Sequence, residues 1–129
     1  LNGEPIQVSK VSTVDQSLIA TGFPYTNFTY LKQFMNSMDY FMKNSHGLRR
    51  LGSAATDIAY VACGRYDGFF EYGLNPWDIA AGILLVKEAG GEASYFDGHK
   101  EPLFSGDIIC TNRNNYAEFQ EIIHQIMKS

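Results

Sequence analysis

Apolar and polar positions along the chain alternate in short runs that predict strands separated by helices. Strand-like alternation is expected over residues 5–10, 17–21, 47–51, 67–72, 92–96 and 107–111. Apolar residues recur at helical spacing over residues 28–43, about 52–63, 78–89 and 115 onward. Strands that alternate with helices predict an α/β domain, in which helices cover a mixed, largely parallel sheet.

Three of the predicted helices carry a more detailed pattern. The helix over 28–43 has a stripe of aromatic and methionine side chains, which we expect to face the core; a cofactor-binding face is the alternative. The helix over 78–89 is apolar on nearly every face, so we expect it to be largely buried. Asn115 and Glu118 have the spacing of a capping box at the start of the last helix.

Length and charge narrow the class of protein. The 129 residues suit a single domain over 1–129, and the net charge of −4 argues against binding to nucleic acid or to an anionic membrane. Small molecules or other proteins are therefore the expected partners. Cys63 and Cys110 lie in apolar stretches, which favours reduced thiols in a cytoplasmic protein. No apolar run has the length of a membrane span. The first residue is Leu1, in a turn, so we expect a piece of a longer protein.

Several common catalytic signatures are absent from the sequence. It contains no P-loop, no G-x-G-x-x-G, no C-x-x-C, no H-E-x-x-H and no G-x-S-x-G. His46, His99 and His124 lack metal-ligand spacing, so we interpret them as ordinary surface histidines.

The segment Gly52-Ser53-Ala54-Ala55 is the first candidate for chemistry. Free N–H groups and the positive dipole at a helix start bind anions such as phosphate, and small side chains let the anion approach. The alternative is that Ser53 only caps the helix and the alanines only pack.

Two carboxylates complete the candidate site. Asp78 is either a helix cap or a hard oxygen ligand for Mg²⁺. Glu71 ends a predicted strand, where it would accept hydrogen bonds from a polyol or simply face solvent. Because consecutive α/β units bring helix starts and strand ends to one edge of a sheet, these residues together predict a site for a phosphorylated hydroxyl compound.

The motifs around these residues resemble the inositol monophosphatase family of Mg²⁺-dependent, Li⁺-sensitive sugar phosphatases. The resemblance is carried by G-S-A-A at 52–55, D-G-F-F-E-Y-G-L at 67–74, P-W-D-I-A-A-G at 76–82 and E-A-G-G at 88–91. It implies that the chain is the C-terminal α/β lobe of a layered αβαβα fold, with the N-terminal half absent.

The resemblance also implies roles for single residues. Asp78 matches the family's aspartate that binds metal and contacts a substrate hydroxyl, and Glu71 matches the glutamate that hydrogen-bonds the inositol ring. Gly52, Ser53 and Ala54 match the segment that lines the phosphate and substrate pocket. In the family, Mg²⁺ ions bridge the phosphate and promote in-line attack by water, without a covalent intermediate.

The sequence departs from the family at its other metal ligands, because it has no D-P-[IL]-D-G-T element. We therefore expect the full-length parent to hydrolyse inositol 1-phosphate or a related sugar phosphate monoester, as a homodimer, and the chain alone to be inactive. The alternatives are a non-catalytic binding or assembly module, or a sister phosphatase for fructose 1,6-bisphosphate or 3′-phosphonucleotides.

Overall fold

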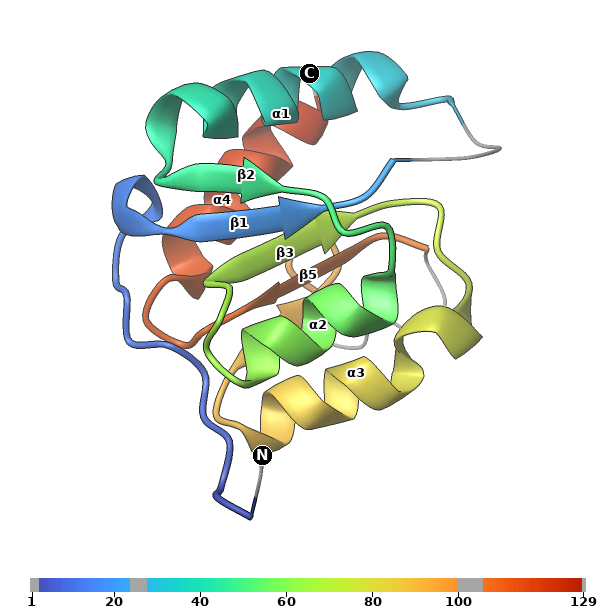
Figure 1. Ribbon diagram of the computed structural model, residues 1–129. Coiled ribbons are helices and arrows are strands. Elements are labelled where there is room, and N and C mark those ends of the chain that lie inside the picture. The colour runs from blue at the N-terminus through green and yellow to red at the C-terminus, as the bar shows by residue number, and fades with distance from the viewer. Residues whose placement is uncertain (1–2, 24–27, 100–105, 129) are drawn as a thin grey trace.

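A five-stranded mixed sheet forms the centre of the computed structural model, which describes residues 3–23, 28–99 and 106–128 (Figure 1). The strands are β1 (Leu18–Thr21), β2 (Gly47–Arg49), β3 (Gly68–Glu71), β4 (Glu92–Ser94) and β5 (Ile108–Thr111), in the spatial order β2-β1-β3-β5-β4. Strand β1 pairs in parallel with β2 and β3, whereas β5 is antiparallel to both β3 and β4. The predicted mixed sheet is confirmed, with its parallel pairings confined to the β2-β1-β3 half.

Two layers of helices cover the sheet (Figure 1). Helices α1 (Leu31–Asn44) and α4 (Tyr116–Met127) pack on one face, and α2 (Ala54–Ala62) and α3 (Pro76–Glu88) pack on the other. Successive residues of β3 serve opposite faces, because side chains alternate along a strand. Phe69 joins the core under α2 and α3, and Phe70 joins the core under α1 and α4.

The segment over residues 5–10 does not form the strand predicted for it. Its backbone is extended, but Ile6 and Val8 only pack at the edge of the core, and Val8 donates a single hydrogen bond of 3.1 Å to the carbonyl of Ala89. Alternation predicts an extended, half-buried segment correctly, but within the described part of the chain this segment pairs with none of the five strands. A short 3-10 helix at Val14–Gln16, which was not predicted, follows it.

Helix α3 is less buried than its apolar composition predicts. Ile79, Gly82 and Val86 are its buried residues, whereas Trp77 is 78% and Leu84 60% exposed. The stripe on α1 is also only partly in the core, since Phe34 and Phe41 are buried and the side chains of Leu31, Met35 and Met42 are exposed. Periodicity identifies an apolar face, but it does not show whether another element covers that face.

The predicted capping box of α4 is wrong. Asn115 precedes the helix, but its side chain donates to the hydroxyl of Ser17 at 2.7 Å instead of capping. Glu118 accepts a hydrogen bond of 2.8 Å from the backbone N–H of Val14. Both side chains therefore tie α4 to the segment before β1, a long-range use that local spacing cannot reveal.

The other predicted elements are confirmed with small shifts of their ends. The described helices include none that is long and apolar enough to cross a membrane. Cys63 and Cys110 are both free thiols, as predicted; Cys110 is buried and Cys63 is half-buried.

Candidate functional site

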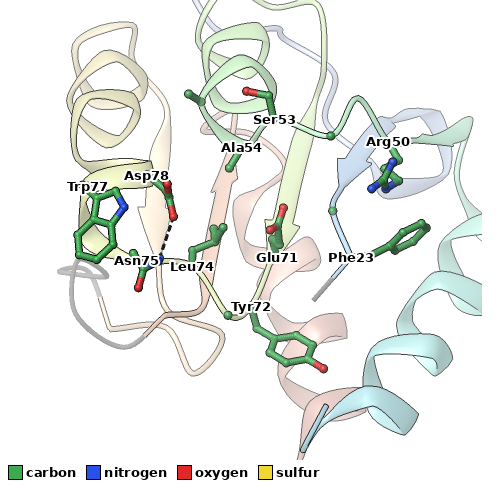
Figure 2. A pocket seen from close by; sticks show the side chains of 14 residues that line it. Phe23, Arg50, Ser53, Ala54, Glu71, Tyr72, Leu74, Asn75, Trp77 and Asp78 are labelled. Atoms are coloured by element: carbon green, nitrogen blue, oxygen red, sulfur yellow. Dashed lines mark hydrogen bonds between the residues drawn. The ribbon is translucent and has the colours of Figure 1, made fainter. Parts of the chain in front are cut away.

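A pocket of about 580 Å³ lies where β1 and β3 end and where α2 and α3 begin (Figure 2). Because β1 and β3 run parallel, their carboxyl ends meet at one edge of the sheet, and the helices that follow β2 and β3 begin beside it. The pocket is lined by all five residues predicted for the site: Gly52, Ser53, Ala54, Glu71 and Asp78. The predicted convergence is thus present in the structure, whereas their roles in binding remain predictions.

The start of α2 forms one wall of the pocket. Ser53 is the N-cap residue, and its hydroxyl accepts a hydrogen bond of 3.3 Å from the N–H of Thr56. Gly52 has a φ of +87°, a left-handed conformation that other residues adopt only at a cost. The first N–H groups of a helix have no intrahelical partner, so those of Ala54 and Ala55 remain suited to an anion. Capping by Ser53 and anion binding are compatible here.

Asp78 is the third residue of α3, and its carboxylate forms part of a capping box with the N-cap residue, so the predicted capping role is confirmed at a position inside the helix. The helix begins at Pro76, and Asn75 is the N-cap residue. One carboxylate oxygen of Asp78, Oδ2, accepts a hydrogen bond of 3.1 Å from the N–H of Asn75, as Figure 2 shows. Proline at the first helical position, with its fixed φ, explains why the helix starts two residues earlier than predicted. The side chain is half-buried at the pocket wall, and its Oδ1 makes no hydrogen bond to the described residues.

Glu71 is the last residue of β3 and is only 7% exposed. Burial, together with the negative charges of Asp57 and Asp78, raises its pKa from 4.5 to about 7, and the positive charge of Arg50 opposes this shift. Glu71 is therefore the deepest charged group of the pocket. Desolvation at the end of a buried strand is the main cause of its shifted pKa.

Asp57, a residue that sequence reasoning did not select, lies in the first turn of α2, and its charge acts on Glu71. It is fully buried, and neither of its carboxylate oxygens has a hydrogen-bond partner among the described residues. Burial raises its pKa to about 6, again against the field of Arg50. In the sequence, Asp57 is indistinguishable from an ordinary acidic residue in the first turn of a helix, so its burial could not be predicted from the neighbouring residues.

Arg50 and Phe23 form the opposite wall of the pocket (Figure 2). The guanidinium carbon of Arg50 lies 4.6 Å from the centre of the Phe23 ring, which is cation–π geometry. Arg50 is thus the cation that partly offsets the acidic groups of the pocket. The Arg49-Arg50 pair stands out in a sparsely basic sequence, but only the structure shows which of the two enters the site.

The described residues of the pocket offer oxygen atoms of the kind that could bind a metal ion, but too few to surround one. Among residues 3–23, 28–99 and 106–128, no cluster of three or more histidine, cysteine, aspartate or glutamate residues could hold a metal ion. Asp78 Oδ1 offers a single hard oxygen of the kind that Mg²⁺ prefers. Asp78 is thus a candidate for a single metal ligand, and the described residues form no cluster that could hold a metal ion by themselves.

Sequence comparison places the chain in a known family. The inositol monophosphatase family profile matches residues 1–128, and the chain belongs to this family. It is 44% identical over 123 residues to the inositol-1-monophosphatase of Synechocystis sp., covering 95% of this chain and 43% of that protein. It is 46% identical over 112 residues to the Nus factor SuhB of Escherichia coli, covering 87% of this chain and 42% of that protein. The chain thus spans less than half the length of these relatives.

Solved structures agree with this assignment. The inositol monophosphatase of Anabaena superposes with a TM-score of 0.85 at 36% identity, covering 96% of this chain and 50% of that one. An IMPase of Thermotoga maritima superposes with a TM-score of 0.83 at 36% identity, covering 98% of this chain and 48% of that one. The resemblance inferred from the sequence motifs is confirmed, as is the α/β fold class.

Proposed function

We propose that the full-length parent of this chain is a Mg²⁺-dependent phosphatase that hydrolyses inositol 1-phosphate or a related sugar phosphate monoester. The observation that carries the proposal is the convergence of the α2 start, Glu71 and Asp78 on one pocket. A helix start suits the phosphate, a buried carboxylate suits the hydroxyl groups of a ring, and an aspartate oxygen suits the metal.

Each group has a defined task in this proposal. The N–H groups at the start of α2 bind the phosphate oxygens, with Ser53 and Gly52 shaping the loop that presents them. Glu71 accepts a hydrogen bond from a ring hydroxyl and so orients the ring. Asp78 would be the residue of this chain that holds the metal, and the hydrogen bond from the N–H of Asn75 to its Oδ2 orients the carboxylate. When bound, Mg²⁺ polarises the phosphoryl oxygens, promotes attack by water and stabilises the leaving oxygen.

The remaining metal ligands lie outside this chain in the proposal, as do the residues that activate water. A single aspartate binds Mg²⁺ weakly, because this ion is normally held by several oxygens. We therefore expect the isolated chain to show no measurable hydrolysis. We also propose that the parent is a cytoplasmic homodimer whose partners include neither nucleic acid nor a membrane.

A non-catalytic binding or assembly module is the second candidate. Its support is that a relative 46% identical to this chain is named a Nus factor rather than an enzyme. A sister phosphatase, acting on fructose 1,6-bisphosphate or a 3′-phosphonucleotide, would use the same groups on another substrate.

A phosphatase assay of the full-length parent separates these candidates. We expect phosphate release from inositol 1-phosphate with Mg²⁺ and none after chelation with EDTA. The panel should include fructose 1,6-bisphosphate and a 3′-phosphonucleotide. If the parent releases phosphate from none of these three substrates, the phosphatase proposal is rejected and the assembly module is favoured.

A further inference from the structure

Gly22 and Glu71 lie side by side at the edge of the pocket. The parallel register of β1 and β3 pairs Thr21 with Phe70, so the next residue of each strand end is Gly22 and Glu71. A Cβ placed on Gly22 would lie 2.6 Å from Cδ of Glu71, 3.1 Å from its Oε2, and closer still to its Oε1. The carboxylate of Glu71 therefore occupies the space that any side chain at position 22 would need.

Space, not backbone conformation, is what requires glycine at position 22. Gly22 is not among the glycines of positive φ, unlike Gly52 and Gly73. An alanine would fit the backbone here, and the three described atoms nearest to an added Cβ all belong to the Glu71 carboxylate. The pair is thus a direct steric contact between two walls of the pocket.

Little else among the described residues fixes the Glu71 carboxylate. The hydrogen bonds of the described residues include none to its oxygens, and two of its three charged neighbours, Asp57 and Asp78, repel it. Arg50 is its attractive neighbour, and that guanidinium is exposed and stacked on Phe23. The space left by the missing side chain of Gly22, called the Gly22 hollow below, is then the main feature that defines where this carboxylate lies.

We propose that Gly22 is a specificity-determining residue: because it has no side chain, the Glu71 carboxylate can lie where it accepts a hydrogen bond from a substrate hydroxyl. This inference rests on the proposed function of the pocket. A side chain at position 22, just past the end of β1, would force the carboxylate away from that strand end, and both residues line the pocket. The displaced carboxylate would then no longer lie where it can accept a hydrogen bond from the substrate hydroxyl.

The test is a double-mutant cycle in the full-length parent. Gly22→Ala is combined with Glu71→Asp, since aspartate is one methylene shorter and withdraws its carboxylate from the Gly22 hollow. Gly47→Ala is the matched control: Gly47 also has no positive φ, and its added Cβ would lie 3.0 Å from Nη1 of Arg49 and 3.2 Å from Cδ1 of Leu18, both at the far ends of side chains. Steady-state kinetics are measured with inositol 1-phosphate and with p-nitrophenyl phosphate, which has no ring hydroxyl. Crystal structures of the variants complete the set.

The steric account predicts effects that depend on Glu71. Gly22→Ala should raise KM for inositol 1-phosphate about tenfold and leave KM for p-nitrophenyl phosphate within about twofold. In the Glu71→Asp background the same change should alter KM less than about twofold, because the contact is gone. An equal loss in both backgrounds would overturn the proposal, since it would show a structural role of Gly22 independent of Glu71.

Failure of the proposed function gives a different pattern. A wild-type parent that hydrolyses neither ester rejects the phosphatase, and the crystal structure then decides the role of Gly22. A Glu71 carboxylate displaced by more than about 1 Å in Gly22→Ala, but not in Gly47→Ala, supports positioning by Gly22, because a Cβ cannot approach closer than van der Waals contact. An unmoved carboxylate overturns it.

Discussion

The shifted pKa of Glu71 predicts a pH dependence of stability that a single substitution should remove. Glutamine has the shape of glutamate but does not titrate between pH 4 and 8, so Glu71→Gln removes one ionisation and little volume. In the folded chain the pKa of Glu71 is raised from 4.5 to about 7, chiefly by burial. In the unfolded chain it returns to its ordinary value.

The direction in which stability changes with pH follows from the number of protons bound by the folded and unfolded chains. Between pH 4.5 and 7 the unfolded chain has lost the Glu71 proton while the folded chain retains it, so the free energy of unfolding falls as the pH rises through this range. One pKa unit corresponds to about 1.4 kcal/mol, so the shift from 4.5 to about 7 is worth about 3 kcal/mol. The loss is complete above the folded pKa and absent below pH 4.5.

Urea unfolding followed by far-UV circular dichroism from pH 4.5 to 8 measures this difference. Fluorescence is unsuitable, because the single tryptophan, Trp77, is 78% exposed and reports little on the core. The gap between Glu71→Gln and the wild type should widen by about 3 kcal/mol with rising pH. Glu88→Gln, at an exposed site of α3, is the control. Parallel curves for Glu71→Gln and the wild type would refute the assignment of Glu71 as a buried, destabilised carboxylate.

Three further predictions concern packing and capping. Ser53→Ala should lower the free energy of unfolding by about 1 kcal/mol in urea, whereas Ser53→Thr, which keeps the cap, should not. Gly82→Ala should cost about 1–3 kcal/mol, because its Cβ would lie 2.6 Å from Cγ2 of Ile58; a value near zero would contradict the tight α2–α3 contact. Phe34→Ala should cost about 3–5 kcal/mol, since its ring is fully buried against Phe70, and Met35→Ala, at an exposed neighbour, should stay within about 0.5 kcal/mol.

Much of the fold was predictable because it depends on local pattern. The strand ending in Glu71 and the helix beginning after Ser53 are both visible as runs of apolar residues with a polar end. The pattern did not predict which extended segments pair into the sheet, or which apolar helix faces other elements cover. Residues 5–10 alternate like a strand but pair with no strand of the described sheet. Helix α3 is apolar around its axis but leaves Leu84 exposed. Both depend on neighbours that are distant in sequence.

The candidate site was predictable only in part. Gly52, Ser53, Glu71 and Asp78 carry signals of their own, as helix starts and a strand end, and the topology of α/β units brings such ends together. The Gly22 hollow arises from two strands in register and has no signature in either segment alone. For the same reason the buried Asp57 could not be told from an exposed acidic residue in a helix.

The central claim is that Asp78 brings a metal to a phosphate held by the α2 start. Its most direct test is phosphate release from inositol 1-phosphate by the full-length parent and by its Asp78→Asn variant, across a Mg²⁺ titration. The amide oxygen of asparagine can still accept from Asn75, so the fold should be retained while the charged ligand is lost. We expect Mg²⁺-dependent activity in the wild type and at least a hundredfold lower activity in the variant. A hundredfold loss corresponds to about 3 kcal/mol of lost transition-state stabilisation. Equal activity of the two proteins at every Mg²⁺ concentration would contradict it.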